Sequence, residues 1–131
     1  PYITTIVQNI NTRKTSIVLG EQEKVLFGKG YIEDVLCGLR FRISPKSFYQ
    51  INHEQCEKLY AKAKELAQPA CDEILLDAYC GIGTIGMSMA KEWKAVYGVE
   101  VNRDAVRDAK SNALRNKIDH ITLSVRMQAG F

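Results

Sequence analysis

The sequence predicts an α/β layered fold that follows a short β-rich segment, and three observations support this. Two continuous apolar runs, residues 74–76 and 95–99, each end at an acidic residue, as is typical of buried parallel strands. Segments with helical periodicity follow both runs, which indicates strand–helix–strand crossovers. The first part of the chain instead contains short β-rich stretches divided by glycines at hairpin-like intervals.

The β-rich segment covers residues 1–46. Residues 2–7 are rich in strand-forming side chains, and so are residues 16–19, with a turn cluster between them. In residues 39–43, three apolar side chains alternate with two basic ones, and this period of two predicts one apolar face and one basic face. The two residues on the basic face are Arg40 and Arg42.

The remaining elements are three helices and a third strand. The first helix is expected to begin after Asn52, which can cap it, and to end before Pro69. A short helix should follow the first apolar strand and run to about Trp93, and a longer one should begin after Asn102. Residues 121–125 are predicted to form the third strand. One stripe of the first helix is expected to be buried: Cys56, Leu59, Tyr60, Ala63, Leu66 and Ala67.

Composition excludes several classes of protein. The 131 residues are 46% hydrophobic and 25% charged, which is ordinary globular composition, and no apolar run approaches the roughly 20 residues of a membrane span. Without a signal-peptide pattern, we expect a cytoplasmic protein that makes no membrane contact. The net charge of +3 arises within the first 52 residues. No metal site is expected, because the cysteines lack zinc-ligand spacing: Cys37, Cys56, Cys71 and Cys80.

The strongest local signal lies at the end of the first apolar strand. Gly81, Gly83 and Gly86 fit the pattern G-x-G-x-x-G, and Glu100 ends the next strand nineteen residues after the first of them. Taken literally this pattern is a dinucleotide-binding fingerprint, in which the acid binds ribose hydroxyls. Asp77 favours a different ligand, because its carboxylate would repel a pyrophosphate but attract the sulfonium and ammonium of S-adenosylmethionine (SAM). We therefore rank SAM above NAD, and a turn without a ligand below both.

These residues belong to a larger set of motifs. The motifs are Phe41-Arg-Ile-Ser-Pro45, Ser47-Phe-Tyr-Gln-Ile-Asn52, Leu76-Asp-Ala-Tyr-Cys-Gly-Ile-Gly-Thr-Ile-Gly86, Gly98-Val-Glu100 and the segment Ala105–Asn116. Together they resemble the bacterial RNA uracil-5 methyltransferase family, whose members methylate C5 of uridine in ribosomal or transfer RNA. The resemblance covers about residues 3–120, and the glutamine-plus-aromatic linker makes it more specific than the glycine loop alone.

The resemblance implies a fold, a cofactor and a partner. Residues 47–131 would be the N-terminal half of a Rossmann-like, SAM-dependent methyltransferase domain, and residues 1–46 the end of a β-rich central domain. RNA, either rRNA or tRNA, would be the substrate of the intact enzyme. The cofactor-binding residues carried over from the family are Gln50, Asp77, Tyr79, Gly81, Gly83, Thr84 and Glu100.

The resemblance also implies what this segment lacks. In the family a cysteine attacks C6 of the uracil, and a carboxylate-type base later removes the C5 proton. Both groups lie beyond the matched segment, so we expect no catalytic residue here and no activity of this chain alone. Cys80 corresponds to a non-catalytic cysteine of the family. An uncovered sheet edge further predicts self-association, for example as a dimer.

Two other functions stay open at this point. The glycine pattern is compatible with the NAD-binding domain of an oxidoreductase. The basic face of residues 39–43 is compatible with a non-catalytic RNA-binding module, whose RNA affinity would fall steeply with salt.

Overall fold

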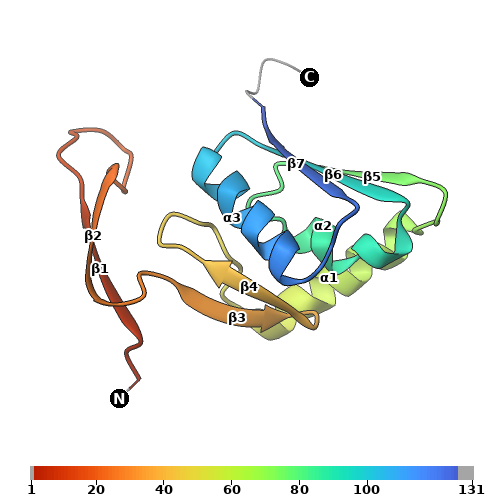
Figure 1. The fold of residues 1–131 in the computed structure, drawn as a ribbon, viewed down its shortest axis with the longest axis horizontal. Coiled ribbons are helices and arrows are strands. Elements are labelled where there is room, and N and C mark those ends of the chain that lie inside the picture. The colour runs from red at the N-terminus through yellow and green to blue at the C-terminus, as the bar shows by residue number, and fades with distance from the viewer. Residues whose placement is uncertain (1, 127–131) are drawn as a thin grey trace.

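The computed structural model describes residues 2–126 and confirms the predicted α/β fold. Two antiparallel hairpins precede a three-stranded parallel sheet and its helices (Figure 1). None of the helices in these residues is long and apolar enough to cross a membrane. In chain order the elements are β1 (Thr5–Ile10), β2 (Gln22–Gly28), β3 (Ile32–Leu36), β4 (Leu39–Ile43), α1 (His53–Ala67), β5 (Ile74–Ala78), α2 (Thr84–Ser88), the 3-10 helix η1 (Ala90–Glu92), β6 (Ala95–Glu100), α3 (Arg103–Arg115) and β7 (Ile121–Val125).

The parallel sheet has the strand order β5-β6-β7, so the carboxyl ends of its strands lie at one edge. All three α-helices lie on one side of this sheet (Figure 1). Strand β6 lies close to β7 and to the loop after β5 because residue 98 is a glycine. An added Cβ at Gly98 would lie 2.6 Å from a methyl carbon of Leu123 and 3.0 Å from the sulfur of Cys80. A side chain at this position would therefore separate β6 from its neighbours.

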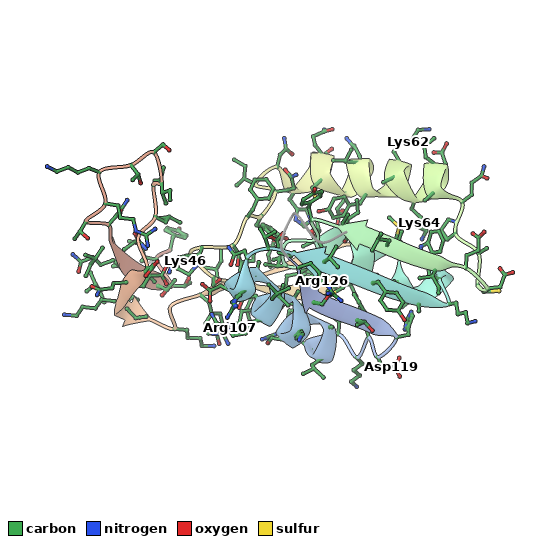
Figure 2. The ribbon with its side chains drawn as sticks, turned by 90° about the horizontal axis from the view of Figure 1, so that it is seen from above. Lys46, Lys62, Lys64, Arg107, Asp119 and Arg126 are labelled. Carbon is green, nitrogen blue, oxygen red and sulfur yellow. The ribbon has the colours of Figure 1, made fainter. Side chains whose placement is uncertain are left out.

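The other side of the sheet is uncovered in the described residues, which corrects one prediction. The apolar run of β5 was expected to be buried on both faces, yet Ile74 and Leu76 are 56% and 58% exposed. Tyr97, the β6 partner of Leu76, is 44% exposed on the same face. Figure 2 shows the sheet from this side, with α1 beyond β5 and α3 beyond β7. The described helices cover only the sheet face on which Leu75 and Val96 lie, so the apolar run of β5 is buried on one face and exposed on the other.

The first hairpin also differs from the prediction. Its first strand covers residues 5–10 rather than 2–7, and residues 16–19 lie in the connection between β1 and β2. Side-chain amides hold this connection: Asn11 donates to the carbonyls of Ile17 and Val18, and Asn9 exchanges two hydrogen bonds with Gly20. Because these carbonyls already have partners, residues 16–19 do not join a β-ladder despite their β-rich composition.

Strand β4 confirms the predicted alternation and docks on α3 through two asparagines. Phe41 and Ile43 are buried. The side chain of Asn112 accepts from the backbone N–H of Arg42 (2.8 Å) and donates to its carbonyl (3.1 Å). Asn116, one helical turn further, makes the same pair of bonds to Arg40, at 2.9 and 2.8 Å. The two amides thus occupy the edge of β4 as a neighbouring strand would.

Replacing Asn112 with alanine should lower the free energy of unfolding by about 2–4 kcal/mol, because two backbone groups of β4 would lose their partners in a buried place. Asn112 is fully buried, whereas Asn116 is half-buried, so Asn116→Ala should cost clearly less. Urea denaturation of both variants measures the difference. Equal losses for the two variants would contradict the proposed role of burial.

Helix α1 begins as predicted, but only part of its predicted stripe is buried. The side chain of Asn52 accepts from the backbone N–H of Gln55 at 3.2 Å, which confirms the cap. Cys56 and Tyr60 are buried, but Leu59 and Leu66 are 57% and 71% exposed. The predicted stripe was therefore too wide, since α1 lies at the margin of the sheet and turns only a narrow face inward.

Candidate functional site at the strand ends

The carboxylate of Glu100 connects the ends of β5 and β6. Its Oε2 accepts from the backbone N–H of Gly81 at 3.1 Å. Its Oε1 accepts from the N–H groups of Val101 and Asn102 at 2.8 and 2.9 Å. The bond to Gly81 confirms that two predicted site residues, nineteen positions apart in the sequence, meet in space. A carboxylate can accept further bonds at its remaining lone pairs, so a ribose hydroxyl is a chemically suitable ligand.

Asp77 lies at the end of β5 and points toward the start of α2. Its Oδ2 accepts from the backbone N–H of Gly86 at 3.0 Å. Burial raises the pKa of this carboxyl to about 6, against the lowering effect of the Gly86 bond. Gly86 is required here because an added Cβ would lie 2.9 Å from Oδ2 of Asp77 and 3.2 Å from a methyl of Val96. The first turn of α2 therefore has a carboxylate held against its backbone.

The loop between β5 and α2 has an unusual backbone. Gly81 and Gly83 have φ values of 55° and 83°, and Tyr79 has a φ of 65°, in the left-handed region that most side chains avoid. At Gly83 an added Cβ would lie 2.7 Å from the terminal methyl of Met87. The side chain of Tyr79 is 62% exposed. The loop thus presents its backbone and one aromatic ring at the sheet edge.

Thr84 begins α2 and is held by a residue that the sequence did not single out for the site. The hydroxyls of Thr84 and Tyr60 are 2.6 Å apart. Tyr60 belongs to the stripe of α1 that was predicted to be buried, and it is buried. A buried tyrosine usually finds a partner for its hydroxyl, which is the signal that could have indicated this contact. Helix α1 is therefore tied directly to the glycine loop.

Gln50 is the predicted site residue that the structure does not connect to the others. It is exposed in the linker before α1, and within residues 2–126 its side chain makes no hydrogen bond to the glycine loop. Helix α1 runs antiparallel to β5, so the linker lies at the end of the molecule where the strands terminate (Figure 1). The linker that contains Gln50 therefore lies at the same end of the sheet as the glycine loop, and the role of Gln50 itself stays a prediction.

Cys80 is buried within this loop, and its environment suits packing. Burial and the nearby carboxylates of Asp77 and Glu100 raise the pKa of the thiol to about 12. Such a thiol is protonated at neutral pH and is a poor nucleophile. Among the described residues, no group of three or more His, Cys, Asp or Glu side chains is arranged to hold a metal ion.

Iodoacetamide should modify the native protein at Cys71 first, because this is the exposed cysteine, and should leave Cys56 and Cys80 unmodified. Peptide mass spectrometry after a short reaction at pH 7.5 gives the order. Unfolding in urea is the control, since it should make all four thiols reactive. Rapid modification of Cys80 in the native protein would contradict its assignment as a packing residue.

A parallel sheet, a glycine-rich turn after its first strand and an acid after its second define a Rossmann-like nucleotide- or SAM-binding domain. The family model described as "tRNA (Uracil-5-)-methyltransferase" matches residues 6–130. Since this match covers nearly the whole chain, the protein belongs to the tRNA (uracil-5-)-methyltransferase family.

The names of individual relatives agree with this family assignment. The chain is 45% identical over 124 residues to an "uncharacterized RNA methyltransferase" of Enterococcus faecalis, covering 95% of this chain and 27% of that protein. It is 51% identical over 122 residues to another "uncharacterized RNA methyltransferase", from Staphylococcus aureus, covering 93% of this chain and 27% of the relative. The chain therefore spans about a quarter of the length of these relatives.

Solved structures give the same fold. The crystal structure of Pyrococcus abyssi tRNA (uracil-54, C5)-methyltransferase in complex with S-adenosyl-L-homocysteine superimposes with a TM-score of 0.76 at 31% identity. That match covers 95% of this chain and 30% of the other. The structure of Methanocaldococcus jannaschii TYW2, solved with AdoMet, has a TM-score of 0.63 at 23% identity, which supports the fold alone.

Proposed function

We propose that this chain forms the SAM-binding part of an RNA methyltransferase that methylates C5 of uridine. The observation that carries the proposal is the Glu100 carboxylate bonded to Gly81, which joins the ends of β5 and β6 into one site. The family match and the Pyrococcus neighbour that holds S-adenosyl-L-homocysteine support the choice of SAM.

The electrostatics of the loop favour SAM over a dinucleotide. In dinucleotide-binding domains a pyrophosphate rests on the free N–H groups at the start of the helix after the glycine turn. Here the carboxylate of Asp77 already accepts from the N–H of Gly86 in that turn. A pyrophosphate would meet this charge, whereas the positive groups of SAM would be attracted to it. This argues against the NAD-binding alternative.

The residues present fit SAM in distinct ways. Glu100 would accept from the ribose hydroxyls, and Asp77 would place negative charge near the positive groups. Gly81 and Gly83 would let the backbone approach the ligand closely, while Thr84 would act through its contact with Tyr60. Tyr79 and Gln50 would supply an aromatic surface and an amide. SAM itself would supply the methyl group.

The catalytic nucleophile and base are expected in the longer protein, beyond the segment that this chain represents. Cys80 does not fill the role of nucleophile, because its thiol is buried and protonated. This chain would therefore bind the cofactor without transferring its methyl group.

A tritium-release assay tests the proposed reaction. RNA carrying [5-³H]uridine loses tritium to water when its C5 is methylated, so a full-length protein containing this segment should release tritium in proportion to methyl transferred from SAM. The 131-residue chain should release none above background. Methyl transfer without tritium release would contradict methylation at C5, and turnover by this chain alone would contradict the assignment of catalysis to the missing part.

A further inference from the structure

One face of α3 carries a row of basic residues beside the end of β7. Arg103, Arg107 and Lys110 are spaced by four and three residues, so they lie on one side of the helix. They line a groove of about 560 Å³ whose apolar lining is Val106 and Val125. We call these three side chains the α3 basic face.

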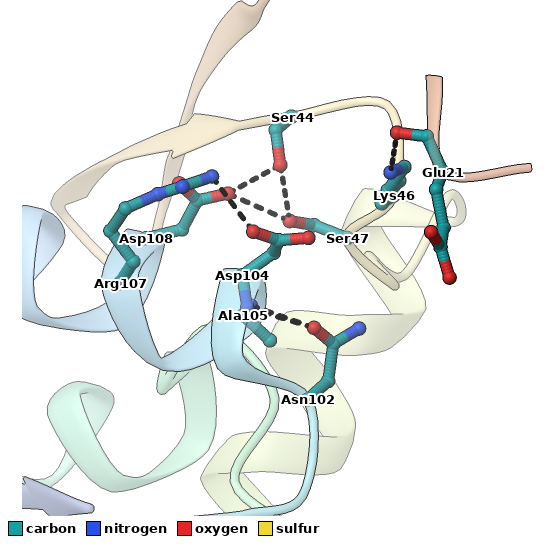
Figure 3. A network of polar contacts seen from close by, with 9 residues as sticks. All are labelled: Glu21, Ser44, Lys46, Ser47, Asn102, Asp104, Ala105, Arg107 and Asp108. Atoms are coloured by element: carbon teal, nitrogen blue, oxygen red, sulfur yellow. Dashed lines mark hydrogen bonds and ion pairs between the residues drawn. The ribbon is translucent and has the colours of Figure 1, made fainter. Parts of the chain in front are cut away.

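The charge of this face is largely uncompensated. In the described part of the chain its ion pairs are limited to that of Arg107 with Asp104, at 3.1 Å. Arg107 is 73% exposed in this pair, and such surface pairs contribute little. The other acid of α3, Asp108, is buried and turned away toward the linker, where its carboxylate accepts from the hydroxyls of Ser44 and Ser47 (Figure 3). The face therefore presents three cations and one carboxylate to solvent.

The basic face of β4, which the sequence suggested for RNA binding, is more fully occupied. The guanidinium of Arg42 lies over the ring of Tyr31 at 3.7 Å. The cross-strand partner of Arg42 is Glu33, which also accepts from Arg115 at 2.6 Å. An aromatic ring thus engages Arg42, and Glu33 beside it is already paired with Arg115, whereas the three cations of the α3 basic face stay available.

The α3 basic face also has a suitable position. Helix α3 begins three residues after Glu100, so its first turns lie at the sheet edge where the predicted SAM residues gather. An RNA substrate must bring its base to that edge, and its phosphates need cations nearby. We propose that the α3 basic face binds the phosphodiester backbone of the substrate RNA, an inference that rests on the proposed function.

Fluorescence anisotropy with a labelled single-stranded RNA of 20 nucleotides tests this proposal, over a series of salt concentrations. The variant is Arg103→Gln/Arg107→Gln/Lys110→Gln. A matched control, Lys58→Gln/Lys62→Gln/Lys94→Gln, removes the same charge from exposed positions elsewhere. Loss of three phosphate contacts should reduce the slope of log affinity against log salt by about 2 and weaken binding about tenfold at low salt. The control should stay near wild type.

SAM binding by the α3 variant separates this inference from the proposed function. We expect the variant to bind SAM like wild type and to unfold at a similar temperature, since its changed side chains are exposed. Equal salt slopes for the two triple variants would overturn the RNA assignment. An acidic protein segment would then be the favoured partner of the α3 basic face. Absence of RNA binding by wild type at low salt would overturn it as well. Failure of wild type to bind SAM would count against the proposed function instead.

Discussion

Replacing Glu100 with alanine should weaken SAM binding by at least about a hundredfold. The carboxylate accepts from three backbone N–H groups, on Gly81, Val101 and Asn102, and is the predicted acceptor for the ribose. Hydrogen bonds to a charged group contribute about 1.5–3 kcal/mol each, so loss of the ribose bond and of the loop geometry together exceeds 2.7 kcal/mol. Isothermal titration calorimetry measures the change.

Two further variants make this result specific. Glu100→Gln keeps one oxygen acceptor and should lose less affinity than the alanine variant. Glu65→Ala removes an exposed carboxylate from α1 and should leave SAM binding unchanged. If Glu100→Ala retained affinity within a few-fold of wild type while folded, the strand-end site would be assigned wrongly.

Replacing Asp77 with asparagine should raise the free energy of unfolding at pH 7 and lower the affinity for SAM. One substitution should therefore change stability and binding in opposite directions. Burial raises the pKa of this carboxyl from 3.8 to about 6. The native state therefore binds the proton more tightly than the unfolded chain, and the free energy of unfolding falls as the pH rises from about 4 to about 6. At pH 7 the ionised carboxylate costs stability, by an amount on the order of 3 kcal/mol.

The asparagine removes this cost, and its side-chain oxygen can still accept from Gly86. Melting at pH 7 should therefore occur about 10 °C higher than in wild type, and the gain should vanish near pH 4. SAM affinity should fall about tenfold because the attractive charge is lost. In wild type SAM affinity should increase between pH 5 and 7, and in the variant it should stay flat.

Asp72→Asn provides the control, because it removes the same charge at an exposed position. It should change neither melting nor SAM affinity. Unchanged SAM binding in Asp77→Asn would show that this carboxylate only holds the α2 turn.

Much of the fold could be predicted because it depends on local signals. Asn52 caps α1 as its side chain and position predict, and Glu100 ends β6 as the apolar run predicts. The exposed faces could not be predicted in this way. Leu76 is apolar whether or not a helix covers it, so its sequence context does not reveal that this face is bare.

The candidate site shows the same limit. Glycine spacing and the acid at the next strand end placed Gly81 and Glu100 together correctly. The contact of Tyr60 with Thr84, and the docking of Asn112 on β4, join residues 24 and 70 positions apart in the chain. No local pattern specifies such pairs, since a buried polar group can find its partner on any neighbouring element.

Calorimetric titration of the 131-residue chain with SAM and, separately, with NAD tests the central claim most directly. SAM should bind to one site, and NAD should give no binding at the same concentration. S-adenosyl-L-homocysteine should compete with SAM. NAD binding as tight as that of SAM would contradict the role given to Asp77, and a folded chain that binds no SAM would contradict the site as a whole.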